Sequence, residues 1–172
     1  TSWQAMATTS SDPSVVATST TGAQAGLFTF NVTQLAAAQS SVFSGSVSTT
    51  SASVVSTGTP VTITNTSTGT ATTINTGDGS LASVIAGINA SNSGVQATAV
   101  QASAGVYKLQ LTSTTTGAAT AFTVAGLSGT LGTLNNTSDA ADAQITVGSG
   151  AAAYPVSSST NTFSQAIPNM TF

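Results

Sequence analysis

Apolar and small polar residues alternate along much of the chain, and this pattern predicts β-strands. The clearest case is Leu27–Thr33, in which two phenylalanines and a valine alternate with polar residues. One face of such a strand is expected to be buried and the other exposed. A turn at Asp12–Pro13 leads into a shorter predicted strand at Ser14–Val16. Gln34–Gln39 is compatible with a continued strand or with a helical turn.

The middle of the chain begins with the pattern of a β-hairpin. Val61–Thr64 and Thr70–Ile74 are rich in β-branched residues, and they flank a short polar segment that ends in Gly69. Two such runs separated by a glycine-containing loop are typical of paired antiparallel strands. We therefore expect a hairpin here.

The hydrophobic period then changes from two to nearly four. Apolar residues recur at helical spacing and form one stripe, at Leu81, Val84, Ile85 and Ile88. Asp78 or Ser80 can cap the start of this helix, and Gly94 can end it. The stripe predicts one short helix, packed against the neighbouring hairpins.

After Gly94 the period returns to two. Val95–Ala99 and Tyr107–Leu111 alternate on either side of a turn at Ala104–Gly105, which predicts a second hairpin. Further strands are predicted at Ala121–Val124, Ile145–Val147 and Tyr154–Val156. Many strands around one helix indicate a mainly β fold of the α+β class.

Between the first strands and the first hairpin, Ser44–Thr59 consists mostly of Ser, Thr, Gly and Ala. This composition is typical of a linker or an edge strand. It places a domain boundary near Ser56.

Composition removes most catalytic chemistry. The 172 residues contain no His, no Cys and four acidic residues, and Lys108 is the one cation. Without His and Cys, catalytic triads, Cys–His pairs, zinc sites of the Cys/His type and disulfides are impossible. One lysine cannot form the basic patch that binding to nucleic acid or to an anionic membrane surface requires. We expect no enzyme, no cofactor, no metal site and no catalytic residue.

The few ionisable residues have ordinary structural interpretations. Asp78 lies in a loop rich in oxygen ligands, but calcium prefers several carboxylates, so helix capping is favoured over a metal site. Asp139 and Asp142 are close enough to share a helical face, with no group nearby to activate water. Lys108 is expected to point to solvent, on the face of its strand opposite to the apolar residues.

Three parts of the chain together resemble the flagellar filament cap protein, also called hook-associated protein 2, of the FliD family. The order and spacing of these parts also match. The first part resembles the family's entry into its head region, the second its "IN" motif, and the third its return segment. The segments are Asp12–Val15 with Ala25–Ala36; Gly79–Ala90 with Gly94–Ala97 and Tyr107–Ser113; and Ala143–Val147 with Ser159–Thr171.

The resemblance implies two small antiparallel β-rich head domains, the second inserted in the first and carrying one short helix. Residues 1–55 and 128–172 would form the first domain, and residues 56–127 the inserted one with the IN motif. The family's coiled leg segments, which flank the head in full-length proteins, are not represented. The chain therefore resembles the head alone.

The resemblance also implies a structural function. Caps of this family form a ring-shaped homo-oligomer at the tip of the filament, outside the cell, and promote the assembly of flagellin. Proteins of this family are secreted through the flagellar export system, without a cleaved signal peptide. Two alternatives stay open: a tip-located adhesin domain that binds mucin or a host surface, and the head of another flagellar axial protein. No interface residue follows from one sequence.

Overall fold

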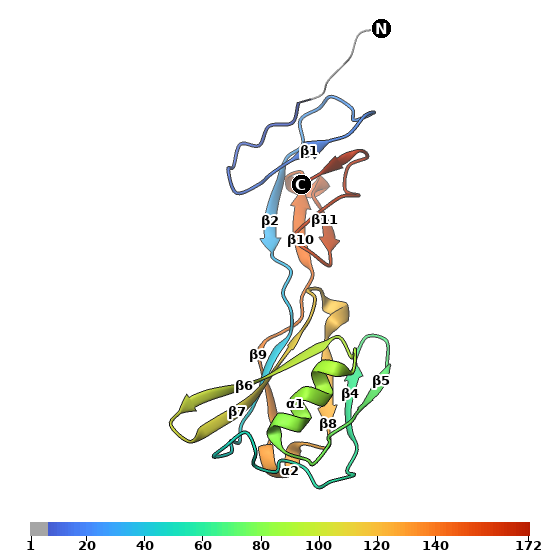
Figure 1. The fold of residues 1–172 in the computed structure, drawn as a ribbon. Helices are drawn as coiled ribbons and strands as arrows, with labels where there is room; N and C mark the ends of the chain where they lie inside the picture. Colours follow the sequence, from blue (N-terminus) through green and yellow to red (C-terminus); the bar gives the residue numbers. More distant parts are fainter. Residues whose placement is uncertain (1–6) are drawn as a thin grey trace. The chain divides into compact units, whose positions relative to one another are not determined.

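The chain folds into two compact units. The computed structural model describes residues 7–172 (Figure 1). Unit 1 comprises the described residues up to Ala36 together with Asp142–Phe172, and unit 2 comprises Ala37–Ala141. Strands dominate both units, and every strand pair is antiparallel. The mainly β fold that the alternation predicted is confirmed.

A four-stranded sheet forms one layer of unit 2. Its order is β6-β7-β3-β9, and its strands are β3 (Ser40–Phe43), β6 (Val95–Ser103), β7 (Val106–Ser113) and β9 (Leu134–Ser138). The predicted hairpin after Gly94 is confirmed as β6 and β7, which pair over nearly their whole length. The sheet thus joins a local hairpin to two strands that are distant in sequence.

The second sheet of unit 2 has the order β5-β4-β8. It contains β4 (Val61–Asn65), β5 (Ala71–Ile74) and β8 (Phe122–Ala125). Val61 pairs with Ile74, which confirms the first predicted hairpin. The predicted strand near Phe122 is also present, as β8.

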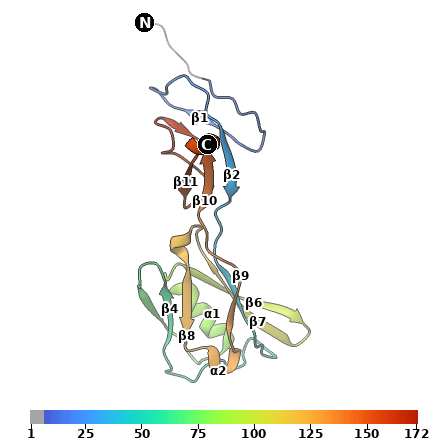
Figure 2. The same cartoon turned by 180° about the vertical axis from the view of Figure 1, so that it is seen from behind.

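Helix α1 (Leu81–Ala90) confirms the helical stripe. Leu81, Val84 and Ile88 are buried, and α1 lies on the same side of both sheets in two opposite views (Figures 1 and 2). Of the two candidate caps, Ser80 is the N-cap residue, because its Oγ accepts a hydrogen bond from the Ser83 N–H at 3.2 Å.

One buried side chain links the two sheets of unit 2. Gln39, just before β3, is 3% exposed. Its Nε2 donates to the carbonyl oxygen of Phe122 at 3.0 Å, and its Oε1 accepts from the Phe122 N–H at 2.9 Å. A buried amide that bonds both backbone groups of a strand residue replaces the ladder that is missing between the sheets.

The segment between β3 and β4 belongs to unit 2. Val54 and Val55 are 2% and 7% exposed, and the N–H groups of both bond to the carbonyl oxygen of Gly79. The composition of this segment suggested a linker. The two valines instead anchor it to the core of unit 2. The units divide at Ala36/Ala37 and Ala141/Asp142. The domain boundaries predicted from the sequence lie near residues 55 and 128.

The difference in boundaries has a clear physical cause. Strands β3 and β9 lie in the predicted first domain, but β3 pairs with β7 on one side and with β9 on the other. This long-range pairing places both strands in the unit that contains the hairpins. Composition and local period carry no information on such pairing.

Unit 1 contains a three-stranded sheet of order β11-β10-β2. Its strands are β2 (Phe30–Gln34), β10 (Ala143–Val147) and β11 (Tyr154–Ser158). Ala143, Ile145 and Val147 on the central strand are buried. The strands predicted at Ile145–Val147 and Tyr154–Val156 are confirmed as β10 and β11, which pair with each other. Strand β2 begins three residues later than the predicted Leu27–Thr33 strand.

The rest of unit 1 is a short strand pair and an aromatic cluster. Strand β1 (Thr18–Ser19) pairs with β12 (Met170–Thr171). The strand predicted at Ser14–Val16 is wrong, because these residues belong to a turn and an irregular segment before β1. The rings of Phe30 and Phe172 stack with centroids 4.8 Å apart. Gln34–Gln39 contains no helical turn, and its structure is extended, with one bridge from Ala37 to Ala141.

The remaining elements are single turns. They are α2 (Ser128–Leu131), η1 (Ala118–Thr120) and η2 (Gly150–Ala152). Among residues 7–172, no helix has the length and apolar character needed to cross a membrane.

Candidate interaction surfaces

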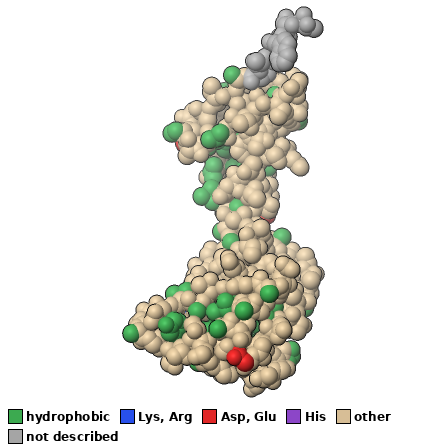
Figure 3. Space-filling model, viewed as in Figure 1, with side chains coloured by type: hydrophobic (Ala, Val, Ile, Leu, Met, Phe, Trp, Pro, Cys, Tyr) green, Lys and Arg blue, Asp and Glu red, His purple; other side chains and the backbone are tan. Residues whose placement is uncertain are grey.

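The ionisable side chains are dispersed over the fold. Asp12 and Asp142 belong to unit 1, and Asp78, Lys108 and Asp139 to unit 2. Within residues 7–172, no three acidic side chains lie close enough to hold a metal ion. Figure 3 shows one face of the molecule, and acidic side chains occupy little of it. The charged residues therefore form no common site in the described part of the chain.

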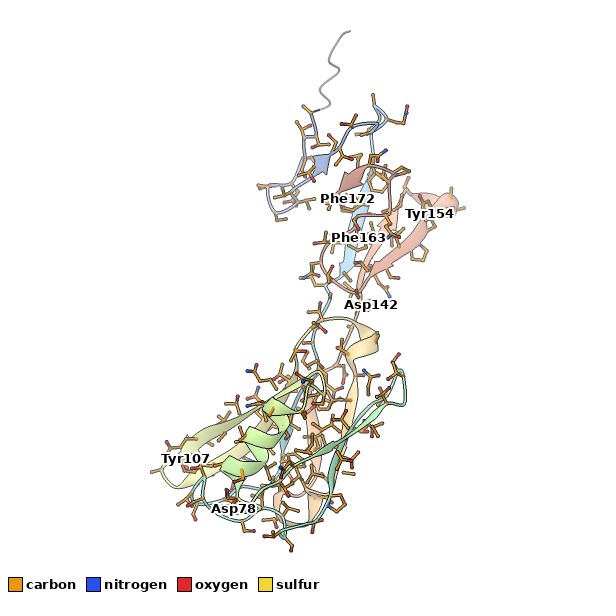
Figure 4. The ribbon with its side chains drawn as sticks, turned by 45° about the vertical axis from the view of Figure 1, so that its right-hand side comes forward. Asp78, Tyr107, Asp142, Tyr154, Phe163 and Phe172 are labelled. Atoms are coloured by element: carbon orange, nitrogen blue, oxygen red, sulfur yellow. The ribbon has the colours of Figure 1, made fainter. Side chains whose placement is uncertain are left out.

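Asp78 organises the start of α1. Its Oδ1 accepts a hydrogen bond from the Ser80 N–H at 3.0 Å. Bonds from the Ser83 hydroxyl and the Ser80 backbone lower the pKa of Asp78 to about 2. These bonds favour the ionised carboxylate. Asp78 thus supports the cap that Ser80 supplies, and it lies at the edge of unit 2 in Figure 4.

Asp139 and Asp142 do not lie on a helix, because the chain is extended there. Asp139 follows β9, and its Oδ1 accepts from the Asn136 Nδ2 at 2.7 Å. Asn136 in turn accepts from the Ser41 hydroxyl at 2.7 Å. Asp139 is therefore the outer end of a hydrogen-bonded chain that leads to the buried Gln39, and the shared helical face considered for the two carboxylates is wrong.

Lys108 is on the face of β7 opposite to the buried Leu109, as predicted, and its ammonium group also bonds the backbone. Its Nζ donates to the carbonyl oxygens of Ser44 at 2.6 Å and Phe43 at 3.4 Å. The lysine thus binds the end of β3 and has a structural partner.

Polar side chains cover part of the outer side of the four-stranded sheet in unit 2. Directly opposed residues share a face of a sheet, and the pairs Gln96–Thr112 and Thr98–Gln110 lie on the face opposite to the core. Gln110 Nε2 donates to the Ser40 hydroxyl at 3.2 Å. We call this the polar face; its members are Gln96, Thr98, Gln110, Thr112 and Ser40. It offers amides and hydroxyls, and the next pair on the same face, Val100–Lys108, adds an apolar side chain and a lysine.

Unit 1 instead exposes large apolar side chains. Leu27 is 96% exposed, Val16 74%, Leu35 64% and Val32 51%. All four line one hollow of about 1470 Å³, which lies between the segment before β2 and the sheet of unit 1. We call this the apolar hollow. Scattered exposed apolar residues are ordinary, but a group that lines one concave surface is a candidate contact surface.

The floor of the apolar hollow is the apolar face of the sheet. Ile145 and Val32 are paired across β10 and β2, and both line the hollow. Phe163 and Phe172, which Figure 4 places close together, also line it, with ring centroids 5.7 Å apart. Asp12 is the single ionisable residue among the described residues that line it.

The sequence did not identify this hollow. The alternation in Leu27–Thr33 correctly marks apolar residues, but it predicts that their face is buried. In the structure Phe28 and Phe30 are half-buried and Val32 is exposed, because little of unit 1 covers that face. Leu35 and Val16 carried no signal, since isolated apolar residues in polar segments are common on surfaces.

The middle of the chain matches a known family model. The model of the flagellin hook IN motif matches residues 60–115. This range runs from the loop before β4 to the end of β7 and includes α1. The comparison with curated proteins finds no match.

Solved structures extend the similarity over nearly the whole chain. The D2–D3 domains of the flagellar cap protein FliD from Escherichia coli align with a TM-score of 0.82 at 28% identity, covering 95% of this chain and 89% of that one. The resemblance to a FliD head is confirmed. The D2–D3 domains of FliD from Serratia marcescens align with a TM-score of 0.77 at 26% identity, covering 91% and 89% of the two chains.

A longer FliD structure shows how much of such a protein the chain represents. In the D1-D2-D3 structure of Escherichia coli FliD, the TM-score is 0.83 at 28% identity, and the chain covers 51% of that protein. The chain thus corresponds to the D2–D3 part of FliD, and the IN motif lies inside unit 2.

Proposed function

We propose that this chain is the head of a flagellar filament cap, which works outside the cell at the filament tip and promotes the assembly of flagellin. The observation that carries the proposal is the alignment with FliD D2–D3 domains over 95% of the chain. A cap acts by contact, so it requires binding surfaces and no catalytic group. In this proposal the protein reaches the tip through the flagellar export system and acts as a homo-oligomer.

The surfaces of the chain support such a role. The polar face offers hydrogen bonds from Gln96, Gln110 and their neighbours, while Lys108 on the same face already bonds the end of β3. Contacts of this kind depend on shape and hydrogen bonds and respond weakly to salt, since screening acts on charged groups. Flagellin and neighbouring heads are the partners that the proposal assigns to these surfaces.

Self-association can be tested by light scattering after size exclusion, over a series of concentrations. We compare the chain alone with a fusion in which the D1 segments of Escherichia coli FliD flank it. The proposal predicts that the fusion forms a discrete oligomer. A fusion that stays monomeric at every concentration, while Escherichia coli FliD itself assembles, would contradict a ring-forming head.

Adhesion is the second hypothesis, because a protein at the filament tip is the first to meet a surface. Binding of the purified chain to immobilised mucin at physiological salt separates the two functions. Saturable binding that free mucin glycans compete away supports an adhesin. Absence of binding, together with oligomer formation by the fusion, leaves assembly as the function.

A further inference from the structure

The outer edge of β2 is unpaired in the described part of the chain. Strand β2 is the last strand of the sheet β11-β10-β2, and β10 is its one strand partner. Residues along an antiparallel strand alternately direct their backbone polar groups toward the partner and away from it. The Gly148 N–H donates to the Thr29 carbonyl at 3.0 Å, so Thr29 faces β10.

The alternation assigns the outward groups to two residues. Thr29 and Asn31 face β10, where Asn31 pairs with Thr146. Phe30 and Val32 therefore direct their N–H and C=O groups away from the sheet. Outside the ladder with β10, no backbone hydrogen bond from residues 7–172 reaches these groups. An edge of this kind is a template for one more strand.

Residues of this edge strand line the apolar hollow. Its lining includes Phe30 and Val32, whose side chains lie on the apolar face, and also Asn31 and Gln34, which lie on the other face. Residues from both faces of β2 thus line the same hollow. A chain placed there meets backbone donors and acceptors together with exposed apolar side chains.

We propose that the β2 edge and the apolar hollow bind an extended, uncharged segment of a second protein, which adds as a further strand beside β2. The unpaired groups of Phe30 and Val32 select an extended backbone over a helix, whose own groups are already paired. The lining carries one carboxylate, Asp12, which the Ser14 N–H and hydroxyl already bind at 2.9 and 2.7 Å. A charged segment would lose hydration without gaining a partner.

The pleat of a β-strand determines which side chains of the added segment face the hollow. Alternate residues of a strand point to one face, so every second side chain of the segment lies over the hollow, near Leu27 and Leu35. Apolar side chains at those positions would cover surface that is now exposed. The proposal goes beyond the cap function and does not rest on it.

A peptide probe tests the proposal directly. The probe is Ala-Gln-Ile-Thr-Val-Gly with blocked termini, which copies residues 143–148 of β10. It is uncharged, alternates apolar residues, and has a sequence already compatible with pairing to β2. We expect saturable binding to the intact chain, with slower hydrogen exchange at the amides of Phe30 and Val32. No binding, or protection confined to other residues, would overturn the proposal.

A backbone variant distinguishes strand addition from simple apolar contact. Val32→Pro removes an outward N–H that makes no bond to β10, and proline is tolerated on the free side of edge strands. The matched control Val32→Thr keeps the N–H and the β-branched shape. We expect Val32→Pro to weaken peptide binding about tenfold or more, and Val32→Thr about threefold or less. Equal weakening by the two variants would contradict strand addition.

Two further measurements complete the test. A fully N-methylated peptide has no backbone donors, so binding as strong as that of the parent peptide overturns the proposal even if Val32→Pro fails to fold. Sedimentation of the chain alone identifies a different occupant. If the chain dimerises and Val32→Pro abolishes the dimer, the edge binds a second copy of this chain, and the proposal of a different partner is wrong.

Discussion

The two units of the chain differ in how completely they bury their apolar residues. Unit 2 packs two sheets and a helix around a large cluster that includes Phe43, Leu81 and Leu109. Unit 1 buries a few residues around Ile145 and Phe163, and it leaves the apolar hollow open. Unit 2 therefore encloses its apolar core, whereas unit 1 leaves part of its apolar surface exposed, as the proposed strand addition requires.

The largest expected effect is the difference in stability cost between truncating a buried leucine of unit 2 and an exposed leucine of unit 1. Leu109 is fully buried in unit 2, and Leu27 is 96% exposed in unit 1. Leu109→Ala should lower the free energy of unfolding by about 2–5 kcal/mol, since it removes transfer energy and leaves a cavity. Leu27→Ala should change it by less than about 0.5 kcal/mol. Thermal unfolding followed by the NMR signals of each unit measures both, and similar costs for the two variants would contradict the comparison.

Gln39 tests whether the polar link between the two sheets is required. Gln39→Leu leaves the N–H and C=O of Phe122 without their side-chain partner. Because an unsatisfied buried group costs about 1–3 kcal/mol, we expect unit 2 to lose about 2–3 kcal/mol. Gln96→Leu, on the exposed polar face, is the matched control and should be nearly neutral in denaturant unfolding. A neutral Gln39→Leu would mean that apolar packing alone joins the sheets.

Gly87 tests how closely α1 packs against the rest of unit 2. A Cβ at Gly87 would meet the carbonyl oxygen of Asn75, so the helix depends on the absence of a side chain there. Gly87→Ala should destabilise unit 2 by about 1–3 kcal/mol, although alanine favours helix. Gly129→Ala in α2 is the control, because a Cβ there meets nothing within 4 Å. Stabilisation by both variants in thermal unfolding would show that α1 is not held close to Asn75.

The smallest effect is a pH dependence at the start of α1. The folded pKa of Asp78, about 2, is below its ordinary value of 3.8. The ionised form is therefore stabilised in the folded state. This contribution is present above about pH 3.8 and is lost as the pH falls toward 2. NMR titration should find the low pKa, and Asp78→Asn should remove that part of the pH dependence. An unshifted titration would contradict the bonds from Ser80 and Ser83.

Local elements could be predicted well from the sequence. The stripe at Leu81, Val84 and Ile88 specified α1, because four-residue recurrence reports a single packed face. The β6–β7 hairpin followed from two alternating runs around Gly105. In each case the partner element is adjacent in sequence, so the local pattern contains most of the information.

Long-range organisation could not be predicted in the same way. The pairing of β3 with β7 and β9 shifts both unit boundaries, and no local pattern marks it. The burial of Val54 depends on the Gly79 carbonyl, which lies far along the chain. The apolar hollow was missed because the same alternation describes a buried face and a docking face. Only the surrounding structure separates the two.

The most direct test of the central claim is a chimera in which this chain replaces the D2–D3 domains of Escherichia coli FliD. The chimera is expressed in a strain that lacks its own FliD, and filament length and flagellin released to the medium are measured. The account predicts that filaments form and that most flagellin is retained in them. Stable, exported chimera with no filaments and with all flagellin in the medium would contradict a cap-head function.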